Sequence, residues 1–287
     1  MSEHFYQLQI DDWSRLRVEL SWVYEGEVAA AYLKETSPHY GQSVFLLRSG
    51  AVEVANEWGK AKAGPGEWIL PRQGQRRQQF SPGSRILSVH LDLHWPGGKP
   101  LFDWKTALVF PAARFPQLEI HTRRLERLVQ KEFPGARQNL RYLPATLAVD
   151  CRLRRHFYAW FEVYCRTMLQ LGLQPTHMGS IDPRILSVVE YLDHASFAVP
   201  CREGDLAVRA GLSISQLNRL FLRHFGLSPR RYREKRRLDS ALVQIHRSRP
   251  VKEIAYELGF KSLPHFSAWF RQNTGFSPTA VRRGEST

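Results

Sequence analysis

The segment DLAVRAGLS at residues 205–213 and the segment EIAYELGFKS at residues 253–262 follow the same design. Each predicts a short helix, a turn at a glycine and a serine that caps the next helix. Glycine accepts the positive φ of such a turn, and the serine hydroxyl accepts a hydrogen bond from an N–H group in the first turn of the following helix. This order of elements is typical of a helix-turn-helix unit, and the chain contains it twice.

The residues after each unit repeat the same pattern. Apolar side chains at positions i, i+3 and i+4 predict the buried face of a second helix: Leu217, Leu220 and Phe221 in the first unit, and Phe266, Trp269 and Phe270 in the second. Each unit closes with a glycine and a Ser-Pro pair, at residues 226–229 and 275–278, and proline suits the first turn of a helix. One linking helix is predicted between the units, over residues 230–246, with inward positions at Tyr232, Leu238, Leu242 and Ile245.

Residues 182–287 therefore resemble the DNA-binding region of the AraC/XylS family of bacterial transcription regulators. The resemblance rests on residues 205–221, 226–232 and 254–260 together with 275–278, and it covers over a third of the chain. It implies that both second helices enter adjacent major grooves on one face of the duplex, about one helical turn apart.

The resemblance places base-reading residues near the start of each second helix, on the side not used for packing. These candidates are Ser215, Gln216, Asn218 and Arg219 in the first unit, and Leu263, Pro264, His265 and Ser267 in the second. Arg219 leads them, because a guanidinium can bind O6 and N7 of guanine together, as the amide of Gln216 or Asn218 can bind adenine. The second unit has Ala268 where the first has Arg219. We therefore expect the second unit to contribute mainly positioning on the DNA and recognition of DNA shape.

Phosphate contacts are predicted at the two capped helix N-termini and at neighbouring polar and basic side chains. The candidates are Ser213, Arg223, Lys261, Ser262, Arg271 and Gln272. The densest basic run lies in the linking helix at Arg230, Arg231, Arg233, Lys235, Arg236 and Arg237. A solvated face explains part of this run, because opposite sides of one helix cannot all meet the same DNA.

The net charge of +14 is distributed unevenly along the chain. Residues 1–110 hold 12 basic and 12 acidic residues, residues 111–180 hold 11 and 5, and residues 181–287 hold 18 and 10. A neutral first part followed by a basic last part suits a sensing domain joined to one that meets a polyanion. Double-stranded promoter DNA is the expected partner.

A length of 287 residues leaves room for about two domains, and the first part reads as β structure. Strands are predicted at residues 44–47, 51–54, 68–70 and 85–91, with turn residues between them. Apolar stripes within residues 125–133 and 153–168 predict two amphipathic helices after the strands. The predicted fold class is thus α+β, a β-barrel with trailing helices followed by an all-α domain. The expected boundaries are 1–172 for the first domain, 173–181 for a linker and 182–287 for the second domain.

The first domain resembles the cupin-like effector domain that is common in this family. GEWILP at residues 66–71, followed by Gly74, is similar to a cupin's second motif, and FLLRSG at residues 45–50 is similar to the end of the first. The metal-binding histidines of cupins are missing, since residues 75–77 read QRR and a single His39 precedes the first motif. A metal needs several ligands together, so neither a metal site nor a cofactor is expected.

A small-molecule effector is expected at the mouth of the barrel. The candidate contacts are Tyr24, His39, Arg72, Arg76, Arg77 and Trp95. Six of the eight tryptophans precede residue 110, and aromatic planes suit a sugar or another flat polar ligand. Arg72, Arg76 and Arg77 instead suit the carboxylate or phosphate of an acidic metabolite. Both alternatives stay open on the sequence.

The sequence predicts a ligand-responsive transcription regulator that is not an enzyme. It contains no nucleophile-base motif, P-loop or GxGxxG, no secretion signal and no apolar run of membrane-spanning length, so a cytoplasmic protein is expected. The resemblance implies an activator that contacts RNA polymerase, and the apolar stripes at residues 118–171 suggest a homodimer. The alternatives are an architectural DNA-binding protein without effector and a cupin-type enzyme with an accessory basic domain.

Overall fold

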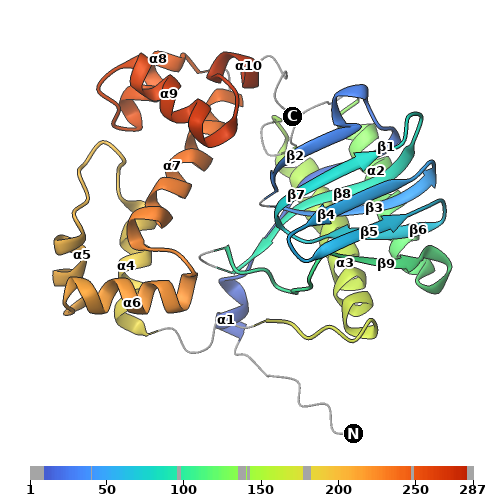
Figure 1. The fold of residues 1–287 in the computed structure, drawn as a ribbon, viewed down its shortest axis with the longest axis horizontal. Coiled ribbons are helices and arrows are strands. Elements are labelled where there is room, and N and C mark those ends of the chain that lie inside the picture. Colours follow the sequence, from blue (N-terminus) through green and yellow to red (C-terminus); the bar gives the residue numbers. More distant parts are fainter. Residues whose placement is uncertain are drawn as a thin grey trace, which may run out of the picture. The chain divides into compact units, whose positions relative to one another are not determined.

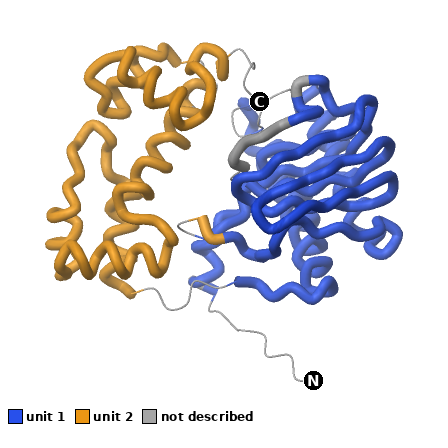
Figure 2. Tube along the Cα trace, in the orientation of Figure 1, with its two compact units in different colours: residues 1–96, 100–177 blue, residues 97–99, 178–287 orange. Residues whose placement is uncertain are grey.

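The computed structural model describes residues 10–39, 41–95, 98–134, 140, 143–176, 182–246 and 249–282. The chain divides into two compact units, residues 1–96 with 100–177 and residues 97–99 with 178–287. We call the first the β unit and the second the helical unit. Figure 1 labels their elements and Figure 2 colours the two units separately. Residues 177–181 of the predicted linker lie outside the described residues.

The β unit contains two antiparallel sheets. The strands that the structure describes are β1 (Arg17–Glu27), β2 (Lys34–His39), β3 (Gln42–Ser49), β4 (Val52–Asn56), β5 (Gly59–Ala63), β6 (Glu67–Pro71), β7 (Gly74–Phe80), β8 (Arg85–His94) and β9 (Ala107–Pro111). The larger sheet has the order β1-β8-β3-β6-β9, and the smaller has the order β2-β7-β4-β5. Two stacked antiparallel sheets of this kind are the architecture of cupins and other jelly rolls.

Side-chain alternation explains which residues lie between the two sheets. In β3, Phe45 and Leu47 join a buried core with Val54 and Phe80 of the smaller sheet. The residues that alternate with them, Val44 and Leu46, are also fully buried, on the other face of their sheet. Because both faces of β3 are covered, its apolar residues form a continuous run, which the sequence shows clearly.

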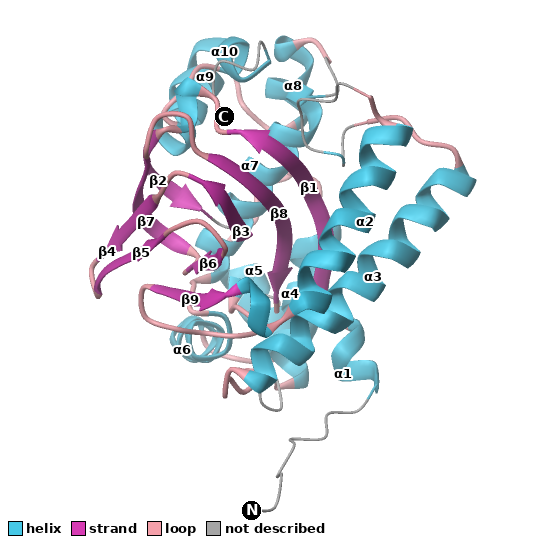
Figure 3. Ribbon diagram, turned by 90° about the vertical axis from the view of Figure 1, so that its right-hand side faces the viewer, coloured by secondary structure: helices cyan, strands magenta, loops and turns pink. Residues whose placement is uncertain are grey.

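Two helices cover the outer face of the larger sheet. Helix α2 (Pro116–Glu132) packs against β1 and β8, and α3 (Leu147–Gln170) packs against α2, as Figure 3 shows. The apolar stripes that suggested a dimer, among them Leu125, Val129 and Trp160, are buried within the unit. These stripes therefore cover the sheet, and the homodimer stays a prediction without their support. A short helix, α1 (Ile10–Ser14), precedes β1.

The helical unit consists of two helix-turn-helix units joined by one long helix. Its helices are α4 (Pro183–His194), α5 (Glu203–Ala210), α6 (Ile214–Phe225), α7 (Pro229–His246), α8 (Val251–Glu257), α9 (Leu263–Thr274) and α10 (Pro278–Arg282). Gly211 ends α5 in the left-handed conformation with φ of 61°, and Gly226 ends α6 in the same way with φ of 66°. These are the turns that the sequence predicted.

Each helix-turn-helix unit has its own core, and the linking helix α7 contributes to both. Tyr232 is buried with Leu217 and Phe221 of the first unit. Near the other end of α7, Ala241 and Ile245 are buried with the aromatic residues of the second unit, and Leu238 and Leu242 pack against them. The inward positions predicted for this helix are therefore confirmed.

The structure confirms the predicted fold class: a cupin-like β unit with trailing helices, followed by a double helix-turn-helix unit. Three of the predicted strands lie within β3, β6 and β8, and the fourth, predicted at residues 51–54, overlaps β4 but begins one residue before it. The sequence did not reveal β1, β2, β5, β7 or β9. Strand β7, for example, reads GQRRQQF and has a single apolar residue, although its alternate positions Arg76, Gln78 and Phe80 are buried.

Candidate DNA-binding surface and effector region

Helix α6 presents a polar and basic face to solvent. Its core positions, Leu217, Phe221 and Phe225, are buried, which turns the opposite side outward. Of the predicted readers, Ser215 and Arg219 are exposed on this outward side, and the phosphate candidate Arg223 continues it one turn further. Spacing of four residues places these three side chains along one face of the helix. The outward face of α6 can therefore meet DNA.

Two other predicted readers on α6 already have protein partners. Gln216 is part of a capping box, in which its Oε1 accepts from the N–H of Ser213 at 3.0 Å and its own N–H donates to Ser213 Oγ at 3.2 Å. Asn218 is half-buried, and its Nδ2 donates to Glu203 Oε2 of α5 at 3.1 Å. In this arrangement neither amide presents both its groups to a base, so Arg219 stands out among the four candidates.

Helix α9 presents a less polar outward face. Ser262 caps it by accepting from the N–H of His265 at 3.4 Å, and Phe266 and Phe270 form its buried side. The exposed candidates are Leu263, Pro264, His265, Arg271 and Gln272, with Lys261 just before the helix and Ser267 half-buried. The His265 ring packs edge-on against Phe260 at 5.4 Å between ring centroids. Position by position, this surface offers fewer hydrogen-bonding groups than α6, as the sequence suggested.

Three arginines of the basic run on α7 bind backbone carbonyl groups of the helical unit. Arg233 Nη2 donates to the carbonyl oxygen of Val199 at 2.5 Å, in the loop after α4. Arg236 Nη1 donates to the carbonyl oxygen of Leu192 in α4, and its Nε pairs with Asp193 at 3.1 Å. Arg237 Nε donates to the carbonyl oxygen of Leu258 at the end of α8, at 2.7 Å. These side chains hold neighbouring elements on α7, a role that a count of charges could not reveal.

Glu234 completes the attachment of the second unit to α7. Its Oε2 accepts from Trp269 Nε1 of α9 at 3.0 Å, and its Oε1 pairs with Arg237 at 3.3 Å. The Arg237 guanidinium also lies over the Phe260 ring, 4.3 Å from its centroid. An ion pair, a cation–π contact and a carbonyl cap therefore converge where α7, α8 and α9 meet.

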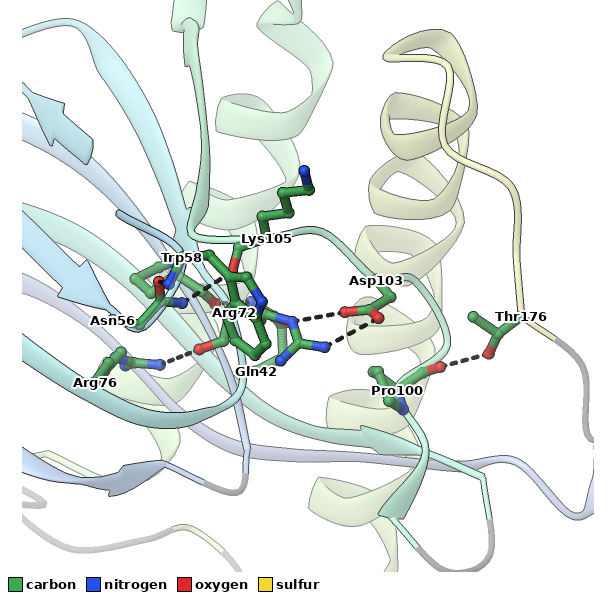
Figure 4. Close-up of polar contacts among 10 residues, drawn as sticks. Gln42, Asn56, Trp58, Arg72, Arg76, Pro100, Asp103, Lys105 and Thr176 are labelled. Carbon is green, nitrogen blue, oxygen red and sulfur yellow. Dashed lines mark hydrogen bonds and ion pairs between the residues drawn. The ribbon is translucent and has the colours of Figure 1, made fainter. Parts of the chain in front are cut away.

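In the β unit, the predicted effector contacts do not form one cluster. Arg72 forms a bidentate ion pair with Asp103, at 2.8 and 3.1 Å, and its guanidinium lies over Trp58, 4.1 Å from the ring centroid (Figure 4). Trp95 is buried elsewhere, where its Nε1 donates to the carbonyl oxygen of Thr176 and its ring packs on Trp13. These side chains are engaged within the protein.

The other described candidates do not bring the set into one cluster, although Arg76 Nη1 donates to the carbonyl oxygen of Arg72 at 3.3 Å. Tyr24 packs against the core between the sheets, and its hydroxyl donates to the carbonyl oxygen of Glu27 at 2.9 Å. His39 ends β2, and its side chain lies outside the described residues. Arg77 points outward from β7, whereas its neighbour Arg76 points between the sheets and is 2% exposed. Of the three candidate arginines, only Arg76 is buried.

Arg76 belongs to a group of polar side chains between the sheets, which we call the polar interior cluster: Ser43, Arg76, Gln78 and His90. Arg76 Nη2 donates to Ser43 Oγ at 3.1 Å, and Ser43 Oγ lies 3.2 Å from Nδ1 of His90. Burial, with a smaller effect of the Arg76 charge, lowers the pKa of His90 to about 4. The imidazole is therefore neutral at pH 7. Ser43, Gln78 and His90 were not among the predicted effector contacts, because they become neighbours only when the two sheets stack.

Because the pKa of His90 is lowered in the folded state, the protein should become less stable as the pH falls. The unfolded state binds a proton at the ordinary pKa of 6.5, whereas the folded state resists it down to about 4. The free energy of unfolding should therefore fall by about 2 kcal/mol between pH 7 and pH 5 from this group. Urea unfolding followed by tryptophan fluorescence checks it, since every tryptophan except Trp269 lies in the β unit. In the His90→Gln variant the free energy of unfolding should depend less steeply on pH. An unchanged dependence would contradict the assignment of this effect to His90.

The described residues contain no group of three or more histidine, cysteine or acidic side chains that could hold a metal ion. No described helix is long and apolar enough to cross a membrane. The cysteines that the structure describes, Cys151, Cys165 and Cys201, are free thiols.

Comparison with known proteins supports the assignment of the C-terminal part. A family model described as a helix-turn-helix domain matches residues 206–284. The transcriptional activator RhaS of Escherichia fergusonii is 36% identical over 105 residues, which are 36% of this chain and 37% of RhaS. The transcriptional regulator GbdR of Pseudomonas aeruginosa is 34% identical over 109 residues, 38% of this chain and 29% of GbdR. The match thus spans about a third of these relatives.

Solved structures share the fold over a longer stretch. An apo form of ToxT from Vibrio cholerae has a TM-score of 0.53 at 11% sequence identity, and the match covers 93% of this chain and 96% of ToxT. A second ToxT structure gives a TM-score of 0.50 at 14% identity, over 93% and 97% of the two chains. At this identity the likeness concerns the fold alone. The helix-turn-helix match and the named regulators confirm the predicted resemblance of the C-terminal part to AraC/XylS regulators. The likeness to ToxT supports the two-domain fold.

Proposed function

From a repeated helix-turn-helix unit of the AraC type and a cupin-like β unit, we propose that this chain is a transcription regulator that binds promoter DNA and responds to a small molecule. The helical unit binds DNA in the cytoplasm, and the β unit binds the effector. The observation that carries the proposal is the duplication: α6 and α9 both bury one face and turn the other to solvent, and one helix, α7, packs into both cores. A pair of such units suits two adjacent major grooves.

Activation, rather than repression, is proposed because the relative RhaS is named an activator. Contact with RNA polymerase and homodimerisation belong to the same proposal. Sedimentation of the full chain at micromolar concentration tests the dimer, and a monomer would remove it. Effector binding must favour one arrangement of the protein over another to change DNA binding, since a ligand with equal affinity for both shifts nothing.

The experiment that tests DNA recognition is selection of bound duplexes from a random pool at near-physiological salt. The full-length chain should enrich two short motifs about one helical turn apart. The more sharply defined motif should belong to α6, because Arg219 offers the strongest base-reading group. Salt-sensitive binding without enrichment would support an architectural DNA-binding protein instead.

Replacing the leading base reader gives the second prediction. Arg219→Ala should reduce the difference in binding free energy between the preferred base pair and its alternatives at one position by about 1–3 kcal/mol. The reason is that a bidentate guanidinium contact to guanine is lost. Affinity for the enriched site and for single-base variants of it, measured by fluorescence anisotropy, checks this. Lys261→Ala is the matched control: it should weaken all sequences alike and lower the salt dependence of binding. Equal losses on all sequences from Arg219→Ala would refute its reading role.

A further inference from the structure

A hydrogen bond between α5 and α6 fixes the orientation of one side chain on the reading helix. Asn218 Nδ2 donates to Glu203 Oε2 at 3.1 Å, and the two helices pack against each other (Figure 1). The direction of this bond follows from its chemistry, because an ionised carboxylate only accepts hydrogen bonds whereas an amide has a donor end and an acceptor end. The amide of Asn218 therefore turns its nitrogen toward Glu203.

The oxygen of the same amide is left without a donor. Among the residues that the structure describes, no group donates a hydrogen bond to Asn218 Oδ1. The side chain is half-buried, at the edge of the outward face of α6. Its neighbours on that face, Ser215 one turn before and Leu222 one turn after, are both exposed, as is the adjacent Arg219. Asn218 thus brings a single acceptor to the surface that carries the leading base reader.

Stability explains little of the presence of Glu203. The core of the first unit already joins the two helices, since Leu206 of α5 is buried in one cluster with Leu217 and Phe221 of α6. Asp205, in the same first turn, already supplies the negative charge that favours the N-terminus of α5. A second carboxylate beside a surface proposed to meet phosphate groups works against DNA affinity. Control of base reading explains the residue better.

We propose that Glu203 is a positioning residue for DNA recognition: it holds Asn218 so that a base beside the guanine read by Arg219 must carry an exocyclic amino group in the major groove. This inference rests on the proposed function as a DNA-binding regulator. Adenine and cytosine present such a donor, at N6 and N4, whereas guanine and thymine present acceptors at the corresponding edge. Asn218 Oδ1 accepts from the first two bases and is repelled by the other two.

An asparagine without this restraint is less selective. Its amide can rotate about the Cβ–Cγ bond, so its nitrogen can donate to guanine O6 or thymine O4 just as its oxygen can accept from an amino group. The Glu203 carboxylate makes the rotated orientation unfavourable, because two oxygen atoms would then face each other. Specificity at this base pair therefore arises from a residue on α5, outside the reading helix.

Selection of duplexes by the full-length chain, followed by fluorescence anisotropy on single-base variants of the enriched site, tests the proposal. Asn218→Ala identifies the base pair concerned, as the position whose preference it removes. At that position the wild type should favour adenine or cytosine over guanine and thymine, on one strand, by about threefold to tenfold. A wild-type preference for guanine or thymine there, or no position affected by Asn218→Ala, would overturn the proposal.

Two variants in the first turn of α5 separate positioning from charge. Glu203→Gln keeps the side-chain length but can donate as well as accept, so Asn218 can rotate and the preference should fall to about twofold or less. Asp205→Asn removes the same formal charge from an exposed position of the same turn. It should strengthen binding to all sequences and keep the base preference. An unchanged preference in Glu203→Gln, or an equal loss in both variants, would contradict positioning by Glu203.

A double-mutant cycle shows whether Glu203 acts through Asn218. In the Asn218→Ala background, Glu203→Gln should have no further effect on base preference, and the guanine preference attributed to Arg219 should remain in both single variants. Loss of that guanine preference in Glu203→Gln would indicate a general disturbance of α6 and refute a positioning role. A wild type that enriches no motif would overturn the proposed function together with this inference. A motif whose base preferences are independent of Glu203 would overturn this inference alone.

Discussion

Phe221→Ala should expose the first helix-turn-helix unit to hydrogen exchange, with protection of α6 amides falling by a factor of about a hundred to a few thousand. Such a loss corresponds to about 3–5 kcal/mol, the usual effect of truncating a buried phenylalanine. The Phe221 side chain is fully buried in the core that holds α4, α5 and α6 together. Its ring lies 4.7 Å from the Phe225 ring and 5.6 Å from the Tyr232 ring, so the deletion would leave a cavity beside two aromatic groups.

Hydrogen exchange with mass spectrometry on the full chain resolves the effect by segment. The adjacent residue provides the control, because Leu222 is 57% exposed on the same helix. Leu222→Ala should change stability by no more than about 0.5 kcal/mol. Peptides from the β unit should be unaffected in both variants. Similar losses of protection from the two substitutions would mean that the core of the first unit is not organised around Phe221.

Arg237→Met should destabilise the second unit by about 2–3 kcal/mol, the contribution of a lost charge-assisted hydrogen bond with its partner left unsatisfied. Methionine retains the apolar stem of the side chain, so the loss of stability reports on the guanidinium group alone. That group caps the carbonyl of Leu258, lies over Phe260 and pairs with Glu234. Protection should fall in α8 and α9.

The exposed Arg231 on the same helix is the matched control for charge. Arg231→Met removes the same formal charge and should leave α8 and α9 as protected as in the wild type. If the two variants behave alike, the basic run acts only through its total charge, and the carbonyl caps described above contribute little.

The helical repeat was predictable because its determinants are local. Gly211, Ser213 and the apolar spacing of Leu217 and Phe221 lie within eleven residues, and the same pattern recurs in the second unit. Helix periodicity and capping act over such distances, so one sequence suffices to identify them. The same reasoning located the linking helix and its buried positions.

The parts that escaped prediction depend on residues that are distant in sequence. Asn218 is a plausible bidentate base reader until α5 brings Glu203 beside it, 15 residues earlier in the chain. The burial of Arg76 depends on a second sheet, because its partner Ser43 is 33 residues away. Strand β7 itself carries almost no apolar signal, so the outward Arg77 and the inward Arg76 cannot be distinguished without the fold.

The attachment of both units to α7 has a mechanical consequence for the DNA. This helix has 18 residues, which makes it roughly 27 Å long at 1.5 Å per residue. Its arginines bind elements next to both helix-turn-helix units, so the offset between the two reading helices is set by the protein. The duplex must then adjust its own bend and twist to fit, at a cost of order 1–6 kcal/mol that depends on base-step stiffness. Base pairs between the two motifs should therefore be selected for flexibility, although no side chain touches them.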